Sequence, residues 1–251
     1  MTDLIEVVEF LDAELRTSEI PDYPGAHNGL QVENEGKVSR VACAVDASLP
    51  VIEKAVAAGA DLLLVHHGLF WQGVRPLTGP AYRKFRLALE NNLAIYSSHL
   101  PLDLHSELGN NVGLARAIGL GKGEAFFDWK GVKLGRRMIV HETVGNLQET
   151  LQKVLGGPVL LRGQPEAAAG TVGIITGGAG SEVEAVTKEG IDTFITGEGP
   201  HWSHPLAEEL GLTVLYGGHY ATETFGVKAL TALLESTFGL PGVFLDHPTG
   251  L

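Results

Sequence analysis

Two adjacent histidines, His66 and His67, directly follow the apolar run at residues 62–65. Successive side chains of a strand point to opposite faces, so each imidazole needs its own polar partner at the edge of a core. A lone histidine in such a position is more often a hydrogen-bonded structural residue than a ligand. A pair is better explained by a metal ion, because neutral imidazole is the commonest metal ligand in proteins.

Two further histidines each stand four residues before a carboxylate: His99 before Asp103, and His219 before Glu223. Nitrogen and oxygen donors of this kind suit Zn, Mn, Fe, Ni or Co better than Cu(I), and the share of imidazole is too high for Ca or Mg. Together with the histidine pair, these donors exceed what one tetrahedral ion can take. We therefore expect two divalent metal ions per chain, at a separation of ~3.5–4 Å that lets them share a carboxylate.

The elements that must position these residues are strands of buried type, alternating with helices. Apolar runs bounded by turn signals predict the strands. They lie at residues 38–45, 61–65, 93–98, 171–176, 191–196 and 213–218. In parallel α/β sheets, ligands gather at the carboxyl ends of the strands, which is where the candidate histidines fall.

The chain also contains an internal repeat. Residues 53–61 match residues 184–192 without a gap, each copy carrying a glutamate, then a glycine that ends a helix, then an aspartate that opens a strand. Residues 93–103 match residues 213–223 after one adjustment, each a strand that leads to a histidine and then a carboxylate. The repeat predicts two related halves.

We therefore expect an α/β fold of two internally related lobes, residues 1–125 and 126–251, with the metal site at the strand carboxyl ends between them. The candidate donors divide into His66, His67, His99 and Asp103 in the first lobe and His219 and Glu223 in the second.

Composition excludes several classes of protein. The chain of 251 residues is 44% hydrophobic and 19% charged, which excludes a disordered or fibrous chain. Its 30 acidic and 18 basic residues give a net charge of −12, which would repel the phosphates of a nucleic-acid partner. The single cysteine, Cys43, excludes a disulfide framework and a cysteine-based zinc site. Without a signal-peptide pattern or a run of ~20 apolar residues, we expect a cytoplasmic protein with no membrane partner.

Six ordered motifs, spread over nearly the whole chain, resemble those of one family. They are Asn28–Val32, Val65–Gly68, His99–Asp103, Glu107–Asn111, Gly197–Glu198 and Gly218–Glu223. The chain resembles the NGG-interacting-factor-three-like family, whose members are often named type 2 homologues of GTP cyclohydrolase I. The stretch from Phe126 to Gly170 carries none of these motifs, and nothing is carried over to it.

The resemblance implies two interlinked α/β lobes, a dinuclear metal centre between them and a toroidal homohexamer. The implied metal ligands are His66, His67, Asp103, His219 and Glu223. Glu223 is the implied bridge between the two ions.

Two further residues are candidate catalytic groups. We expect His99 beside the metals as a proton carrier or a hydrogen-bond donor behind the ligands, with a purely structural role as the alternative. Glu198 leaves the equivalent strand of the second half and is a candidate general base. The Gly177–Gly180 run could cradle a phosphate, but it lacks the P-loop and dinucleotide fingerprints and is better explained by a tight turn. The Leu69–Trp71 segment could stack on a purine or close the core.

Two functions are compatible with these residues. The first is a metal-dependent hydrolase acting on a nucleotide-like or phosphoester small molecule; the family names suggest a purine ring opened with loss of formate, as on GTP. The alternative is a metal or metallocofactor carrier, chaperone or regulatory protein without turnover. The same ligands serve both functions, so the sequence alone does not separate them.

Overall fold

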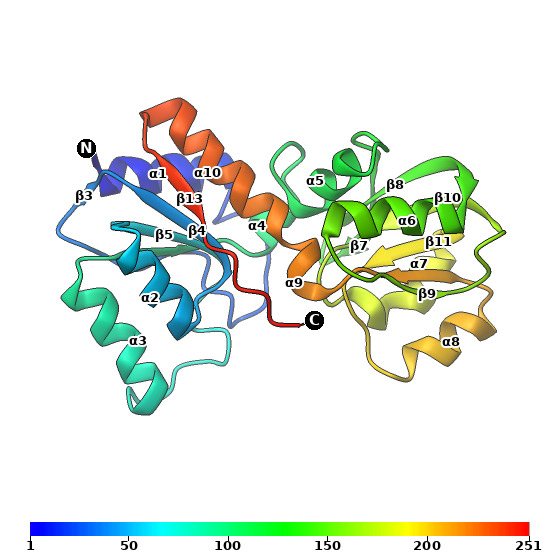
Figure 1. Ribbon diagram of the computed structural model, residues 1–251, viewed down its shortest axis with the longest axis horizontal. Coiled ribbons are helices and arrows are strands. Elements are labelled where there is room, and N and C mark those ends of the chain that lie inside the picture. The colour runs from blue at the N-terminus through cyan, green and yellow to red at the C-terminus, as the bar shows by residue number, and fades with distance from the viewer. Residues whose placement is uncertain (251) are drawn as a thin grey trace. The chain divides into compact units, whose positions relative to one another are not determined.

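The computed structural model describes residues 1–250, which form two compact units (Figure 1). The first unit comprises residues 1–102 and 226–247, and the second comprises residues 103–225 with the segment from residue 248 onward. Both are mixed α/β structures, as expected from the sequence. Within the described residues, no helix is both long and apolar enough to cross a membrane.

The first unit has a five-stranded sheet in the order β13-β4-β5-β6-β2. Its strands are β13 (Gly242–Phe244), β4 (Val41–Asp46), β5 (Leu62–His67), β6 (Ala94–Ser97) and β2 (Gly29–Val32). All neighbours are parallel except β2, which runs antiparallel to β6. A short antiparallel pair joins β1 (Thr2–Asp3) to β3 (Lys37–Val38).

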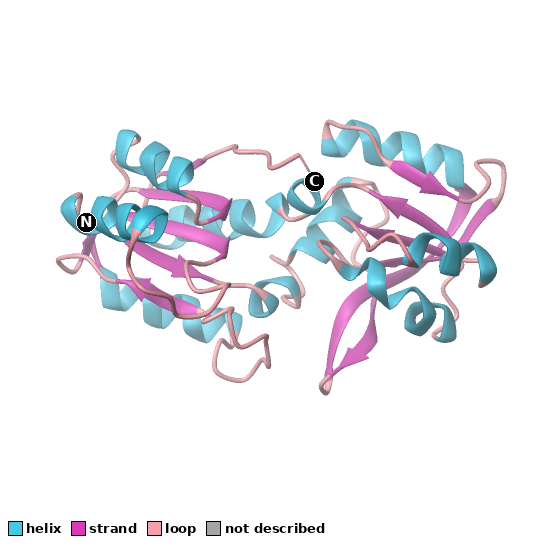
Figure 2. Cartoon of the chain, turned by 90° about the horizontal axis from the view of Figure 1, so that it is seen from below, coloured by secondary structure: helices cyan, strands magenta, loops and turns pink. Residues whose placement is uncertain are grey.

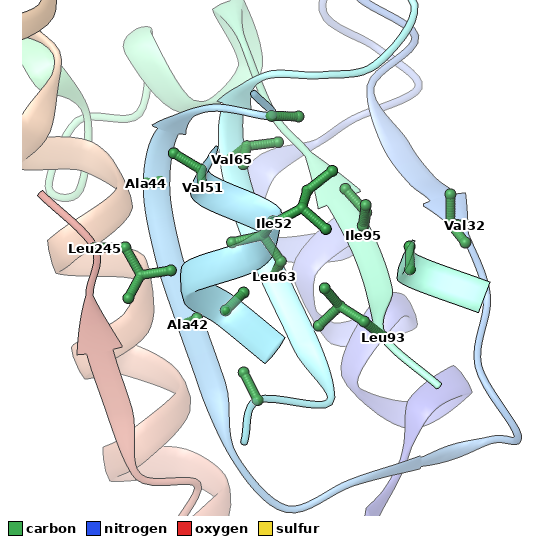
Figure 3. Close-up of a cluster of buried hydrophobic side chains, with 14 residues drawn as sticks. Val32, Ala42, Ala44, Val51, Ile52, Leu63, Val65, Leu93, Ile95 and Leu245 are labelled. Carbon is green, nitrogen blue, oxygen red and sulfur yellow. The ribbon is translucent and has the colours of Figure 1, made fainter. Parts of the chain in front are cut away.

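Helices cover this sheet because its strands are apolar on both faces. The helices are α1 (Leu4–Leu15), α2 (Leu49–Ala57), α3 (Gly79–Glu90) and α10 (Thr224–Phe238), of which α10 begins in the second unit. Ser48 starts α2, its hydroxyl accepting a hydrogen bond from the backbone N–H of Val51 at 3.4 Å. Figure 3 shows Ile52 of α2 directed toward Leu63 of β5 and Ile95 of β6, all fully buried.

The second unit has a six-stranded sheet in the order β7-β8-β10-β11-β12-β9. Its strands are β7 (Glu124–Trp129), β8 (Val132–Thr143), β10 (Ala168–Ile174), β11 (Thr193–Thr196), β12 (Thr213–Tyr216) and β9 (Leu160–Arg162). The three strands β10, β11 and β12 are parallel to one another, and the others pair antiparallel.

Each face of the second sheet packs against its own set of helices, as the secondary-structure colouring of Figure 2 shows. The helices are α5 (Asn110–Ala117), α6 (Val144–Leu155), α7 (Val183–Lys188) and α8 (Ser203–Glu209), with short turns η1 (Ala179–Glu182) and α9 (His219–Thr222). Adjacent strand residues point to opposite faces. Ile195 packs in the core with α5 and α6, while Phe194 packs in the core with α7 and α8.

The repeat seen in the sequence corresponds to repeated structure. Each unit contains three parallel strands in chain order, β4-β5-β6 in the first and β10-β11-β12 in the second. The matching aspartates, Asp61 and Asp192, also make the same kind of hydrogen bond. Asp61 accepts a hydrogen bond from the backbone N–H of Ser39 at 2.9 Å, and Asp192 accepts one from the backbone N–H of Thr171 at 2.8 Å. Asp61 thus holds the segment that enters β4, and Asp192 holds the middle of β10.

The boundaries of the units differ from the division that we expected near residue 125. The last strand explains the difference, because β13 pairs in parallel with β4, with Gly242 opposite Val41, and so completes the first sheet. The chain therefore enters the first unit twice. Asp103, which we expected in the first lobe, belongs to the second unit and ends the short helix α4 (Leu100–Asp103).

Candidate metal centre

The first unit brings three imidazoles together at the carboxyl ends of β5 and β6. His66 and His67 are the last residues of β5, and His99 follows β6. The ring centroid of His66 lies 4.8 Å from that of His67 and 4.9 Å from that of His99. One ring nitrogen from each residue lies within 4.8 Å of the other two, a spacing that a single metal ion can bridge.

The Nδ1 atoms of the histidine pair are held by acceptors on neighbouring strands. His66 Nδ1 lies 2.9 Å from the backbone carbonyl oxygen of Ser98, which can only accept, so Nδ1 carries the proton. His67 Nδ1 lies 2.9 Å from a carboxylate oxygen of Asp46. In both residues the lone pair is thereby left on Nε2, which is the arrangement found in metal-binding histidines.

His99 is oriented by a second carboxylate. Its Nδ1 lies 2.8 Å from Asp22 Oδ1, and its backbone N–H donates to Asn28 Oδ1 at 2.7 Å. Asp22 is buried and its Oδ2 also accepts from Asn28 Nδ2 at 2.8 Å and from the backbone N–H of Leu100 at 2.9 Å. Burial alone would raise the pKa of the Asp22 carboxyl, but these hydrogen bonds hold the pKa below its ordinary value.

Asp22 and Asp46 are site residues that the sequence patterns did not single out. Asp46 directly follows the predicted strand 38–45 and lies opposite His67 in the register of β4 and β5, so its position was a usable signal. Asp22 lies in an irregular segment, 77 positions before His99, and no local spacing connects the two.

The second unit carries the other expected ligands. His219 begins α9, and its Nε2 lies 3.2 Å from Glu223 Oε2, one helical turn later. The Nδ1 of His219 lies 2.6 Å from Glu198 Oε1, so this imidazole also has a carboxylate behind it. Asp103 is buried, and its Oδ1 accepts a hydrogen bond from Asn110 Nδ2 at 2.8 Å.

The glycine run 177–180 makes room for the carboxylate of Glu223. Gly177 has a φ of +70°, and a Cβ atom there would lie 2.0 Å from Glu223 Oε1 and 3.3 Å from His219 Nε2. The backbone N–H of Gly177 donates to Thr222 Oγ1 at 3.1 Å, so it is not directed at a phosphate. The tight-turn interpretation of the run is therefore the better one.

The donor set fits divalent metal ions. In the first unit, three imidazoles offer nitrogen donors. In the second unit, the His219 imidazole offers a nitrogen, and the buried carboxylates of Asp103 and Glu223 offer oxygens. Burying these groups is favourable only with charged or polar partners, and a divalent cation supplies such a partner for several at once. His99, which the sequence left between two roles, belongs to the imidazole group of the first unit.

Without metal, the imidazole of His219 is protonated on both nitrogens and positively charged at neutral pH. Burial by itself lowers the pKa of His219, but hydrogen bonds and charges from Glu223 and Glu198 outweigh burial and raise the pKa to about 9. A metal ion at Nε2 would have to displace the proton there, so metal binding at neutral pH is coupled to proton release.

Replacing Asp46 with Asn should weaken zinc binding by about 10–100-fold, because the amide holds Nδ1 of His67 less strongly and no longer raises its basicity. Isothermal titration in competition with a chelator measures the affinity. Glu19→Gln is the control, since Glu19 is exposed and pairs with exposed Arg16. Equal affinities for Asp46→Asn and wild type would contradict this role of Asp46.

The free energy of unfolding of metal-free protein should fall as the pH rises through about 9. The pKa of His219 is raised from 6.5 to about 9 in the folded state, so its stabilising contribution is complete below pH 6.5 and is lost as the pH passes the folded value. The expected loss is about 3 kcal/mol, which is the free-energy equivalent of that pKa shift. Denaturant unfolding in EDTA measures it, and His219→Gln should show a flatter profile between these pH values. Identical profiles for the two proteins would contradict the assignment.

Comparison with known proteins shows the family of this chain. The family model described as Duf34/NIF3 (NGG1p interacting factor 3) matches residues 2–249. A protein of Deinococcus radiodurans named GTP cyclohydrolase 1 type 2 homolog is 42% identical over 98% of this chain and 94% of its own length. A protein of Archaeoglobus fulgidus with the same name is 39% identical over 99% of this chain and 100% of its own length.

Solved structures agree with the sequence relatives. TTHA1606 from Thermus thermophilus has a TM-score of 0.83 and 39% identity, covering 100% of both chains. Reduced HcgD from Methanocaldococcus jannaschii has a TM-score of 0.86 and 30% identity, covering 98% of both chains. The chain therefore belongs to the Duf34/NIF3 (NGG1p interacting factor 3) family.

Proposed function

We propose that this protein binds two divalent metal ions and, with them, hydrolyses a nucleotide-like or phosphoester small molecule. The observation that carries the proposal is the group of three imidazoles in the first unit, whose ring nitrogens lie within 4.8 Å of one another. Each of these imidazoles has its Nδ1 fixed by an acceptor of the protein. Metal-binding histidines typically have the other ring nitrogen held in this way.

The number of ions is inferred from the number of donors. The proposed ligands are His66, His67, Asp103, His219 and Glu223. These exceed the coordination of one tetrahedral ion, which supports two ions, with Glu223 as the shared carboxylate.

Bound divalent ions would supply Lewis acidity, which brings the pKa of a coordinated water from ~15.7 toward ~7. The residues of the chain then supply orientation and proton movement. His99 Nε2 can accept a proton, and the Asp22 carboxylate at Nδ1 stabilises the charged imidazolium that results. The contact of Glu198 with His219 Nδ1 favours a positioning role for Glu198 over that of a general base.

The substrate class is proposed from two considerations. Relatives at 39–42% identity bear the name GTP cyclohydrolase 1 type 2 homolog, which favours a purine nucleotide. The net charge of −12 disfavours long polyanions, so a small molecule is preferred over nucleic acid.

Elemental analysis of protein prepared without chelator should give two divalent ions per chain. Glu223→Gln should lose more metal than His67→Ala, because a bridging carboxylate serves both ions. A ratio of one ion or fewer, even after soaking with zinc or manganese, would contradict the two-metal proposal.

The same preparations separate the two candidate functions. With GTP and bis(p-nitrophenyl) phosphate as substrates, the hydrolase should show turnover that His66→Ala lowers by at least 100-fold while the fold, measured by circular dichroism, is kept. Two bound ions without turnover on either substrate would instead favour the non-catalytic carrier.

A further inference from the structure

Two loops of the first unit meet beside the three imidazoles: residues 21–28, between α1 and β2, and residues 68–78, between β5 and α3. The side-chain amide of Gln31 fastens them together. Its Oε1 accepts a hydrogen bond from the backbone N–H of Leu69 at 2.7 Å, and its Nε2 donates to the backbone carbonyl of His27 at 2.9 Å. One side chain thus connects both loops.

Two glycines permit this close approach. A Cβ atom at Gly25 would lie 2.4 Å from the backbone oxygen of Trp71, and one at Gly68 would lie 2.2 Å from the amide of Gln31. The contact at Gly25 is with backbone, so a larger residue there would push the two loops apart, and a larger residue at Gly68 would displace the Gln31 amide that joins them. The position of one loop against the other is therefore a built feature of the unit.

Both loops carry aromatic side chains. Phe70 is partly buried, with its ring 5.4 Å from His27 and 5.9 Å from Phe85. Tyr23 and Trp71 are 50% and 40% exposed, and their rings meet edge to face with centroids 6.2 Å apart. We call Tyr23 and Trp71 the aromatic wall.

The aromatic wall continues directly into the imidazole group. The Trp71 ring lies 4.6 Å from His99 and 5.4 Å from His67, and the Tyr23 ring lies 6.1 Å from His99. A flat ligand resting on the wall would therefore have one edge beside these imidazoles. Isolated exposed aromatic residues are common on protein surfaces, but a fixed pair touching two candidate metal ligands is not.

We propose that the aromatic wall binds the purine ring of a small-molecule ligand by stacking and holds it next to His67 and His99. This inference rests on the proposed function, because the purine ring held by the aromatic wall would be part of the proposed substrate. Stacking between a base and an aromatic side chain is strong and needs no charge on the protein. It therefore suits a chain with a net charge of −12, in which attraction to phosphate is weak.

The first experiment uses the fluorescence of Trp71. The chain has three tryptophans, so Trp129→Phe combined with Trp202→Phe leaves Trp71 as the single indole. This zinc-loaded protein is titrated with guanosine 5′-monophosphate, adenosine 5′-monophosphate and ribose 5-phosphate. The two nucleotides should quench the fluorescence, and ribose 5-phosphate, which has the same phosphate but no ring, should not.

The second experiment measures nucleotide affinity by calorimetry in a set of variants. Trp71→Ala should weaken binding at least about five-fold, whereas Trp71→Phe, which keeps an aromatic face, should stay within about three-fold of wild type. Tyr23→Leu tests the other half of the wall in the same way. Trp202→Ala is the matched control, because Trp202 is an exposed tryptophan of the second unit and should have no effect.

The outcomes keep this inference apart from the proposed function. Equal binding of nucleotides and ribose 5-phosphate, no quenching by either nucleotide, or unchanged affinity in Trp71→Ala would overturn the stacking proposal. Zinc content is measured on the same samples. Two bound zinc ions without nucleotide binding would overturn the stacking proposal and leave the metal proposal standing. Nucleotide binding by protein that takes up no zinc would overturn the metal proposal and leave the stacking proposal standing.

Discussion

An imidazole offers a fixed nitrogen to a metal ion only if its other nitrogen is already held, and this constraint governs the first unit. The acceptors come from the strands on either side of β5. Asp46 lies opposite His67 on β4, and the carbonyl of Ser98 lies just beyond β6. Because the register of the parallel sheet fixes these pairs, a slip by one residue would exchange the faces of His66 and His67 and remove both acceptors.

The core and the site are therefore parts of one arrangement. The strands β4, β5 and β6 are apolar because helices pack on the sheet, and the polar residues begin where that packing ends. The second unit applies the same plan with β10, β11 and β12, and His219 follows β12 as His99 follows β6. Gly177 gives Glu223 its space in that unit, so the site there depends on a missing side chain as well as on those present.

Much of this could be predicted from the sequence, because its signals are local. Apolar runs predicted the parallel strands, and the histidines follow strands at a spacing that can be read directly from the sequence. The features that could not be predicted depend on pairing between distant segments. The return of β13 to β4 joins residues about 200 positions apart, and Asp22 reaches His99 across 77 positions. Neither partner has a local pattern that indicates the other.

The central claim is that His66 and His67 carry a proton on Nδ1 and bind metal through Nε2. Long-range ¹H–¹⁵N correlation spectra of uniformly labelled protein report the state of each imidazole nitrogen and are recorded before and after adding zinc. The account predicts that both histidines keep a protonated Nδ1 throughout and that only their Nε2 resonances shift when zinc binds. Zinc-induced shifts at Nδ1 of these residues, or Nε2 resonances that stay unchanged, would contradict it.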